Sequence, residues 1–498
     1  MNRRMAALTL MVSLGTGIAF AQDWPQWRGP NRDAKAADFK APQSWPKELK
    51  QKWNVVVGEG VATPALVGDK LYVFSRQDGN EVTRCLSVTD GKELWSEKYE
   101  SLGASGPAQG FSGPRSSPAV ANGKVVTIGV RGMISCLNAA DGKKIWRKDD
   151  FKAWPGFFPS SSPMIVDGLV IAQLGGRDNG ALVAYDLATG DEKWKWSGSS
   201  PTYASPVLMT VGGTKLIVAH TESKLVAVNA ADGNLAWESA GGPGGEGRPG
   251  GPGGGGAPGG PGGQGGEGGG RGRGMGGGRD YKATTPIIDG QTIIIAGRGV
   301  KAIKLEKDGD KFVSKELWNN GDKTLSFNSP ALKSGLLYGL AGNNELFCLS
   351  AKDGTLAWNA PFPAGAPADP GPRAALERAL SSIPAPIVFG QAAPADPAEP
   401  GQPARPGRPG GPGGPGGPGG RRGGGMGGGG GFGSIVDVGS VLLALTPSAQ
   451  LVAFEPSGKE FKQVASYKVG TQTHAYPVAS GNRIFIKDKD SVTLWTVD

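Results

Sequence analysis

Four aromatic or cationic residues recur at one position of the sequence, three residues ahead of a proline. They are Arg115, Tyr203, Phe327 and His474, and Lys282 lies beside a fifth copy of the same position. Guanidinium and ammonium groups next to aromatic rings suit an anionic, planar or peptide ligand. The competing interpretation is that these are ordinary loop side chains that satisfy the backbone around them. We treat the five as candidate ligand-binding residues.

Other kinds of chemistry find less support in the residue types. The chain has 498 residues but only two His and three Cys, which favours neither a His-based metal site nor a disulfide framework, and the Cys form no CxxC pair. Acidic residues do not cluster near the five candidates, so no metal ligand is predicted. Nothing selects a Ser partner for His474, so no catalytic residue is predicted. The net charge of +9 is a mild basic excess, and no nucleic-acid partner is expected.

The elements that carry the candidates come from a repeated segment. Each copy begins with a small residue and Pro, continues with alternating apolar residues, and ends about 30 residues later in an Asp-Gly or Thr-Gly turn before a Trp. Residues 453–461, AFEPSGKEF, form a shortened copy with Phe in place of Trp. Pro starts the first strand and turn residues separate the others, so each copy predicts four short antiparallel strands.

The two ends of the repeat array predict a closed ring. The last copy runs from Pro477 to Asp498 without a Trp strand, and an orphan Trp strand surrounds Trp53. Pairing the two removes exposed strand edges. Without its Gly-rich segments, the range 52–498 gives about 42 residues for each of eight blades, which is typical of a four-stranded blade. We predict an all-β, eight-bladed β-propeller of four-stranded antiparallel blades, closed by an N-terminal strand.

The segment AYDLATGDEKW resembles the docking motif of the pyrroloquinoline-quinone (PQQ) repeat at Ala184, Asp186, Thr189, Gly190 and Trp194. The resemblance implies that the Trp of each blade docks on the neighbouring blade. The docking residues implied in this way are Trp53, Trp95, Trp146, Trp194, Trp237, Trp318 and Trp358. The three Cys occupy the Ala position of the motif, so we expect them to be buried packing residues.

PQQ-like propellers are known in two functional branches. The catalytic branch oxidises alcohols or sugars with PQQ and Ca²⁺, typically under a vicinal Cys pair that this chain lacks. The other branch resembles BamB, a non-catalytic scaffold of outer-membrane assembly, whose lipid-anchor Cys is also missing here. We expect a binding or assembly scaffold with protein partners and no cofactor. The alternatives are a dehydrogenase dependent on PQQ and Ca²⁺ and, third, a propeller that binds polysaccharide or cell wall.

Four segments lie outside the repeats. Residues 1–21 combine a basic start, an apolar stretch and an A-x-A site, so they predict a cleavable signal peptide and an exported protein, periplasmic or extracellular, without a transmembrane segment after cleavage. Residues 22–51 form a leader that contains DWPQWRGPNRD. Residues 241–279 and 364–432 are Gly/Pro-rich and interrupt the same fourth-to-first strand connection in two blades. We expect both to be disordered inserts.

Overall fold

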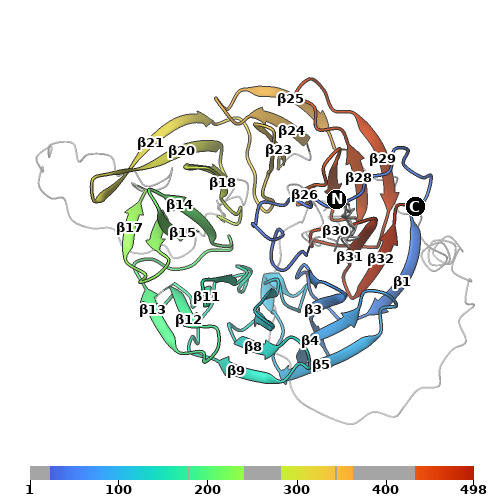
Figure 1. Ribbon diagram of the computed structural model, residues 1–498, viewed down its shortest axis with the longest axis horizontal. Coiled ribbons are helices and arrows are strands. Elements are labelled where there is room, and N and C mark those ends of the chain that lie inside the picture. The colour runs from blue at the N-terminus through green and yellow to red at the C-terminus, as the bar shows by residue number, and fades with distance from the viewer. Residues whose placement is uncertain (1–22, 178, 240–281, 343–344, 363–431) are drawn as a thin grey trace, which may run out of the picture. The chain divides into compact units, whose positions relative to one another are not determined.

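The computed structural model describes residues 23–177, 179–239, 282–342, 345–362 and 432–498. These residues form eight sheets, each of four antiparallel strands, which follow one another around a central axis (Figure 1). The predicted all-β, eight-bladed propeller is therefore confirmed. The expected signal peptide and the Gly-rich inserts, apart from Phe432, lie outside the described residues.

The first four blades are formed by β2 to β17. Their bounds are Ala65–Val67, Lys70–Gln77, Asn80–Ser87 and Glu93–Glu100 in blade 1 (β2 to β5); Ala119–Ala121, Lys124–Ile128, Ile134–Asn138 and Lys144–Lys148 in blade 2 (β6 to β9); Met164–Val166, Leu169–Leu174, Ala181–Asp186 and Glu192–Trp196 in blade 3 (β10 to β13); and Val207–Val211, Thr214–His220, Leu225–Asn229 and Leu235–Glu238 in blade 4 (β14 to β17). A single 3-10 turn, η1 (Gly106–Ala108), lies between blades 1 and 2 among the described residues.

The last four blades are formed by β18 to β32 and β1. Their bounds are Ile287–Asp289, Thr292–Ala296, Val300–Asp308 and Lys311–Asn320 in blade 5 (β18 to β21); Ala331–Lys333, Leu336–Leu340, Glu345–Ser350 and Leu356–Pro361 in blade 6 (β22 to β25); Ser434–Asp437, Leu442–Leu445, Gln450–Phe454 and Gln463–Lys468 in blade 7 (β26 to β29); and Val478–Ser480, Arg483–Lys487, Ser491–Thr496 and Lys50–Val56 in blade 8 (β30 to β32, then β1).

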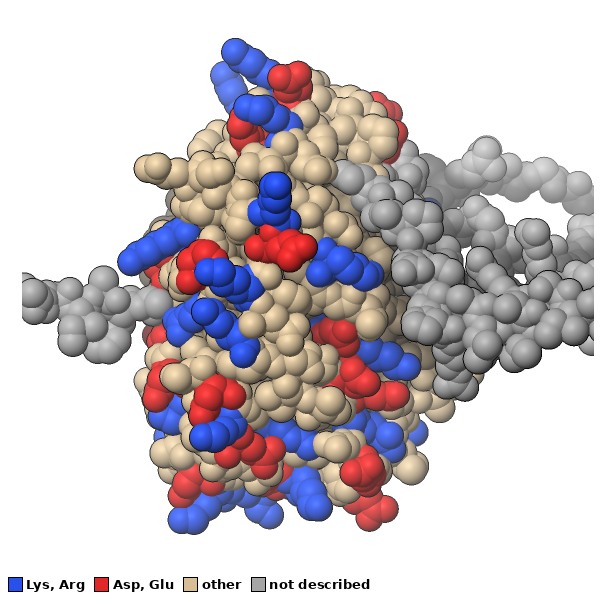
Figure 2. Space-filling view, turned by 90° about the vertical axis from the view of Figure 1, so that its right-hand side faces the viewer, with Lys and Arg blue, Asp and Glu red and all other residues tan. Residues whose placement is uncertain are grey.

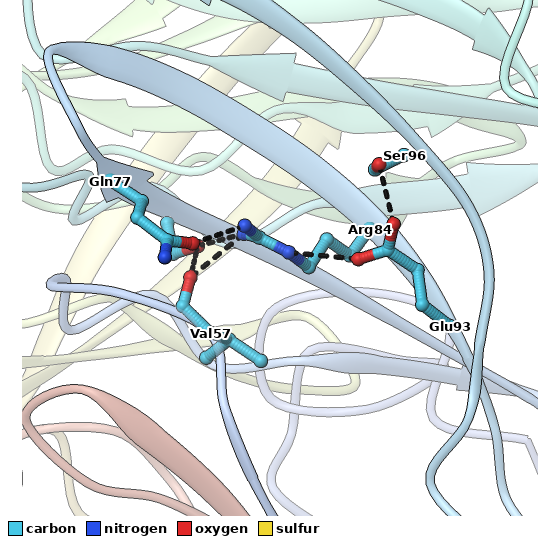
Figure 3. Close-up of polar contacts among 6 residues, drawn as sticks. Val57, Gln77, Arg84, Glu93 and Ser96 are labelled. Atoms are coloured by element: carbon cyan, nitrogen blue, oxygen red, sulfur yellow. Dashed lines mark hydrogen bonds and ion pairs between the residues drawn. The ribbon is translucent and has the colours of Figure 1, made fainter.

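Blade 8 is completed by the N-terminal strand, as predicted. Strand β1 pairs antiparallel with β32, and Trp53 lies opposite Leu494. Arg84 of β4 joins this strand to blade 1: its guanidinium donates to the carbonyl of Val57 at 2.8 Å and pairs with Glu93 at 3.0 Å (Figure 3). The ring is thus closed by strand pairing and by a polar contact across the first and last blades.

The small residue that recurs in the repeat lies on the third strand of blades 1 to 6, opposite the Trp of the outer strand. The second strand β11 is buried along almost all its length, whereas the outer strand β13 buries only Trp194. The residue opposite each such Trp is small, and a bulge follows it. These pairs are Cys85–Trp95, Cys136–Trp146, Ala184–Trp194, Ala227–Trp237, Ala302–Trp318 and Cys348–Trp358. The three Cys are free and buried, and burial raises the pKa of Cys85 to about 12, so they are packing residues as expected.

Most of these Trp residues contact the next blade. The indole N–H of Trp95 donates to the carbonyl of Ala139 at 3.1 Å, and the ring packs on Gly142, where a Cβ would lie 2.4 Å from it. The same packing of Trp on a turn glycine is found for Trp53 on Gly91, Trp146 on Gly190, Trp194 on Gly233 and Trp318 on Gly354. Trp358 donates instead to the carbonyl of Ser457 at 2.7 Å. Trp237 packs among apolar residues of blades 4 and 5, including Ile293.

Blade 7 departs from the sequence alignment of the repeat. The residue that faces Ala453 is Ala465, and Phe461 lies in the loop before β29. The Phe461 ring still lies 5.9 Å from Trp358 and 5.5 Å from Phe454. An aromatic ring therefore fills the space between blades 6 and 7, but it comes from the turn because this blade has no Trp in its outer strand.

The outer surface carries charges of both signs. Figure 2 faces the side of the ring that bears β1 and β29, and there Lys and Arg are interspersed with Asp and Glu. Exposed ion pairs such as Lys462–Glu455, at 2.6 Å, contribute to this pattern. Within the described ranges, none of the helical structure has the length and apolar character of a membrane-spanning helix.

Candidate functional site

A series of six hydrogen bonds runs around the propeller axis from blade 8 through blades 1 to 6. The residue ahead of the first-strand Pro donates its backbone N–H to the hydroxyl of the equivalent residue in the next blade, at 2.8 to 3.3 Å. In order, these residues are Tyr476, Thr63, Ser117, Ser162, Ser205, Thr285 and Ser329. All are buried. We call the six Ser and Thr residues the hydroxyl belt; their sequence signal is the repeated Ser-Pro or Thr-Pro dipeptide.

The channel inside the belt is occupied by the leader, residues 23–39, seen as the blue segment near the centre of the ring (Figure 1). Backbone hydrogen bonds join Trp24 to Leu66 of blade 1 in both directions, at 2.8 and 2.9 Å. Further leader bonds reach Val120 in blade 2, Pro163 in blade 3, Thr285 in blade 5, Pro330 in blade 6, Asp437 in blade 7 and Tyr476 in blade 8. Sequence reasoning left the role of this leader open.

The leader enters from the face that carries the first-to-second strand turns. Asp23 accepts a hydrogen bond from Gly68 in the β2–β3 turn at 2.8 Å, and Lys40 donates to Gly481 in the β30–β31 turn at 2.7 Å. The fourth-to-first connections lie at the other ends of the first strands. We call this second face the mouth; it carries the five candidate residues.

Two of the candidate cations are bonded to backbone carbonyls. The Arg115 guanidinium donates to Phe111 at 2.9 Å and Ala108 at 3.0 Å, and burial lowers its pKa to about 10. The Lys282 ammonium donates to the carbonyls of Thr221 and Glu222. These hydrogen bonds hold loop backbone in place, as the competing interpretation predicts. Because the acceptors are uncharged carbonyls, Arg115 remains a half-buried positive charge.

Aromatic rings form a continuous arc across the mouth. Phe111 lies 4.7 Å from His474, His474 lies 4.9 Å from Phe432, and Phe432 stacks on Phe327 at 4.3 Å. We call these four residues the aromatic arc; Phe327 is 38% exposed. Burial and the nearby charge of Arg115 lower the pKa of His474 to about 4, so its ring is neutral at pH 7. The arc is therefore an apolar surface beside a cation.

The five candidates are connected to different degrees. Arg115 lies close enough to His474 for its charge to lower the pKa of that ring, and Tyr203 lies close enough to raise the pKa of Arg115; Phe327 joins the arc. Tyr203 lies on the neighbouring loops, where its hydroxyl accepts from the backbone N–H of Phe157 at 3.1 Å. Lys282 is joined to that loop through its carbonyl, which accepts from Ala204 at 3.2 Å.

Sequence reasoning missed Phe111 and Phe432. Neither has the spacing to a first-strand Pro that identified the other candidates: Phe111 lies seven residues ahead of the first-strand Pro118, and the first strand after Phe432 has no Pro. The sequence signal that could have identified these two residues is an aromatic side chain in a fourth-to-first strand connection. Across the parts of the chain that the structure describes, no three His, Cys, Asp or Glu side chains form a group that could hold a metal ion.

The chain is similar in sequence both to BamB proteins and to quinoprotein alcohol dehydrogenases. The family described as "Outer membrane protein assembly factor BamB" matches residues 78–247. The chain is 26% identical over 205 residues to a quinohemoprotein alcohol dehydrogenase of Comamonas testosteroni, which covers 40% of this chain and 27% of that protein. It is 23% identical over 200 residues to BamB of Shewanella oneidensis, which covers 38% and 47%. The matches thus span less than half of either relative.

Solved structures share the fold over more of the chain. The crystal structure of BamB from Moraxella catarrhalis matches with a TM-score of 0.51 at 10% identity, over 90% of this chain and 97% of that one. The quinohemoprotein alcohol dehydrogenase of Comamonas testosteroni matches with a TM-score of 0.55 at 13% identity, over 97% and 81%. The repeat, the eight-bladed fold and these similarities together support a PQQ-like β-propeller that is similar both to BamB and to the quinoprotein alcohol dehydrogenases.

Proposed function

We propose that this propeller is an exported, non-catalytic scaffold that binds a protein partner at its mouth. The observation that carries the proposal is the combination of a channel filled by the chain's own leader with an aromatic arc and Arg115 at the opposite face. Aromatic side chains and Arg are the residue types enriched at the energetic centres of protein interfaces. An apolar surface beside a cation suits a peptide that carries an apolar side chain next to a carboxylate.

Export and an assembly role have support of a different kind. Residues 1–21 have the composition of a signal peptide, and several relatives are named outer membrane protein assembly factors. The proposal places the partner in the periplasm or cell envelope.

The second candidate function is a PQQ-dependent dehydrogenase, which the similarity to quinohemoprotein alcohol dehydrogenases favours. Titration of the purified protein with PQQ, with and without Ca²⁺, separates the two functions. A scaffold gives no saturable PQQ binding up to about 100 µM, a concentration within the range of ordinary enzyme KM values, about 1 µM to 1 mM. Saturable, Ca²⁺-dependent binding would contradict the scaffold, and binding of wall polysaccharide in its place would favour the third alternative.

A photo-crosslinking amino acid at the mouth tests the scaffold directly. We place it at Phe327, which is 38% exposed, and at Leu94 of the outer strand β5, which is 50% exposed, as the matched control. The scaffold predicts a discrete protein adduct in the native host at position 327 that is absent at position 94. His474→Ala interrupts the arc and should reduce the adduct without changing the melting temperature of the propeller by more than a few degrees. Identical adducts at both positions would refute a binding site at the mouth.

A further inference from the structure

Two arginines of the leader are buried in the axial channel. Arg28 is 0% exposed and Arg32 is 4% exposed. Arg28 donates to the carbonyls of Ser329 and Pro330, at 3.1 and 2.7 Å, and to the hydroxyl of Tyr476 at 3.1 Å. All of these acceptors are neutral, and the guanidinium also lies 5.6 Å from the centroid of the Tyr476 ring, so among the described residues no carboxylate balances the charge of Arg28.

Arg32 is bonded in the same manner on another side of the channel. It donates to the carbonyls of Pro163 at 2.8 Å and Ser162 at 2.9 Å, and to the side-chain oxygen of Gln26 at 3.2 Å. The pKa of Arg32 is lowered to about 9 by burial and by the charge of Arg28. The two guanidiniums are therefore near enough to repel one another, and neither forms an ion pair with a carboxylate among the described residues.

The leader also carries buried donors that lack acceptors. Among the described residues, no hydrogen-bond partner lies near the Nε–H of Arg28, the Nε–H of Arg32 or the indole N–H of Trp24. All three are donors and all belong to one short segment. A buried donor without an acceptor destabilises the fold, and more so where the group is charged. Any group that satisfies these donors must be a hydrogen-bond acceptor.

The hydroxyl belt adds to this excess of donors. Each belt hydroxyl, such as those of Ser117 and Ser162, accepts a backbone N–H and therefore keeps its own hydrogen to donate. Two buried guanidinium charges without a counter-charge are strongly destabilising, because burial removes their hydration. An anion supplies both the acceptor and the counter-charge, whereas water supplies only the acceptor.

We infer that the axial channel binds a small anion of the chloride type beside the Nε–H groups of Arg28 and Arg32, and that this anion helps to fasten the leader in the ring. Chloride is compact, carries one charge and accepts several hydrogen bonds, as the surrounding donors require. A carboxylate has the same acceptor chemistry and is tested separately. The inference concerns the channel and does not depend on the proposed partner at the mouth.

Thermal unfolding of the full-length protein tests the anion site. Sodium chloride is exchanged for sodium gluconate at constant ionic strength, with sodium formate as the carboxylate probe. We expect the melting temperature to rise saturably with chloride, and Arg32→Gln to weaken the apparent chloride affinity at least tenfold. The matched control is Arg147→Gln, because Arg147 is also largely buried but pairs with Glu97 at 2.7 Å. It should keep the wild-type chloride response.

Crystals of the wild-type protein provide a second readout that does not require the variants to fold. After bromide exchange, we expect an anomalous peak next to Arg28 and Arg32. An equal response to formate, with loss of the bromide peak in its presence, would assign the site to carboxylates in general and retain the anion. A melting temperature independent of the anion together with no bromide peak would overturn the inference and leave water as the acceptor.

Discussion

The contact between Trp95 and Gly142 offers a sharp test of how the blades are held together. Gly142 has φ +74°, and a Cβ there would lie 2.4 Å from the Trp95 ring. Gly123, in another turn of the same blade, has φ +69° and nothing within 4 Å of the added Cβ. Gly123→Ala therefore measures the backbone cost alone, and Gly142→Ala measures that cost together with displacement of the indole.

The structure sets the expected magnitudes. An Ala in the left-handed region costs about 1–2 kcal/mol, so Gly123→Ala should lower the free energy of unfolding by that amount. At Gly142 the indole must move, which adds about 1–3 kcal/mol for overpacking. Displacement of the indole also weakens the 3.1 Å hydrogen bond from Trp95 to the carbonyl of Ala139, which contributes about 1 kcal/mol. Gly142→Ala should therefore be the more destabilising by about 2–4 kcal/mol.

Urea denaturation measures both variants alone and in a Trp95→Ala background. Without the indole, the two substitutions should cost the same, because only the backbone term remains. Equal costs in the wild-type background, or an excess cost of Gly142→Ala that persists in Trp95→Ala, would show that the Trp does not fasten the blades through this glycine.

Three further changes have defined outcomes. Burial lowers the pKa of His220 to about 3 and that of His474 to about 4. Below pH 6.5 the unfolded chain therefore binds more protons than the folded protein. The free energy of unfolding should decrease, as the pH is lowered, by up to about 1.4 kcal/mol per pH unit for each His. His220→Phe should flatten this slope in urea titrations between pH 6.5 and 4.5. Ser162→Ala leaves the buried N–H of Ser117 without its 2.9 Å acceptor and should cost about 1–3 kcal/mol, whereas Ser162→Thr should cost less. Arg84→Met removes the Arg84 contacts drawn in Figure 3 and should lower the melting temperature, whereas loss of a single exposed surface ion pair should leave it nearly unchanged.

The ring closure shows how much of the fold can be predicted from sequence. Pro starts and Gly turns mark each strand locally, and the repetition of these signals gives the blade count without knowledge of any distant contact. The pairing of the strand around Trp53 with the last blade then follows from the missing outer strand of that blade, whereas its register against Leu494 comes from the structure. Phe461 was misaligned because an aromatic ring can reach the same space from a turn or from a strand, and the sequence pattern does not distinguish the two.

The candidate site was predictable only in part. Spacing to Pro identified Arg115 and His474, but not that His474 lies between Phe111 and Phe432, because the connections differ in length. Their residue types suggested a ligand, whereas the bonds of Arg115 to nearby carbonyls also give it a structural role.

The sequence by itself determined the strands, their order and their closure into eight blades, since these depend on local turns and on a repeated pattern. The tertiary structure alone decided where the leader lies. The bond from Arg28 to Pro330 joins residues 302 positions apart, and the hydroxyl belt joins blades whose Ser-Pro dipeptides are individually unremarkable. No local pattern encodes such contacts, because each exists only after the ring has brought its partners to the axis.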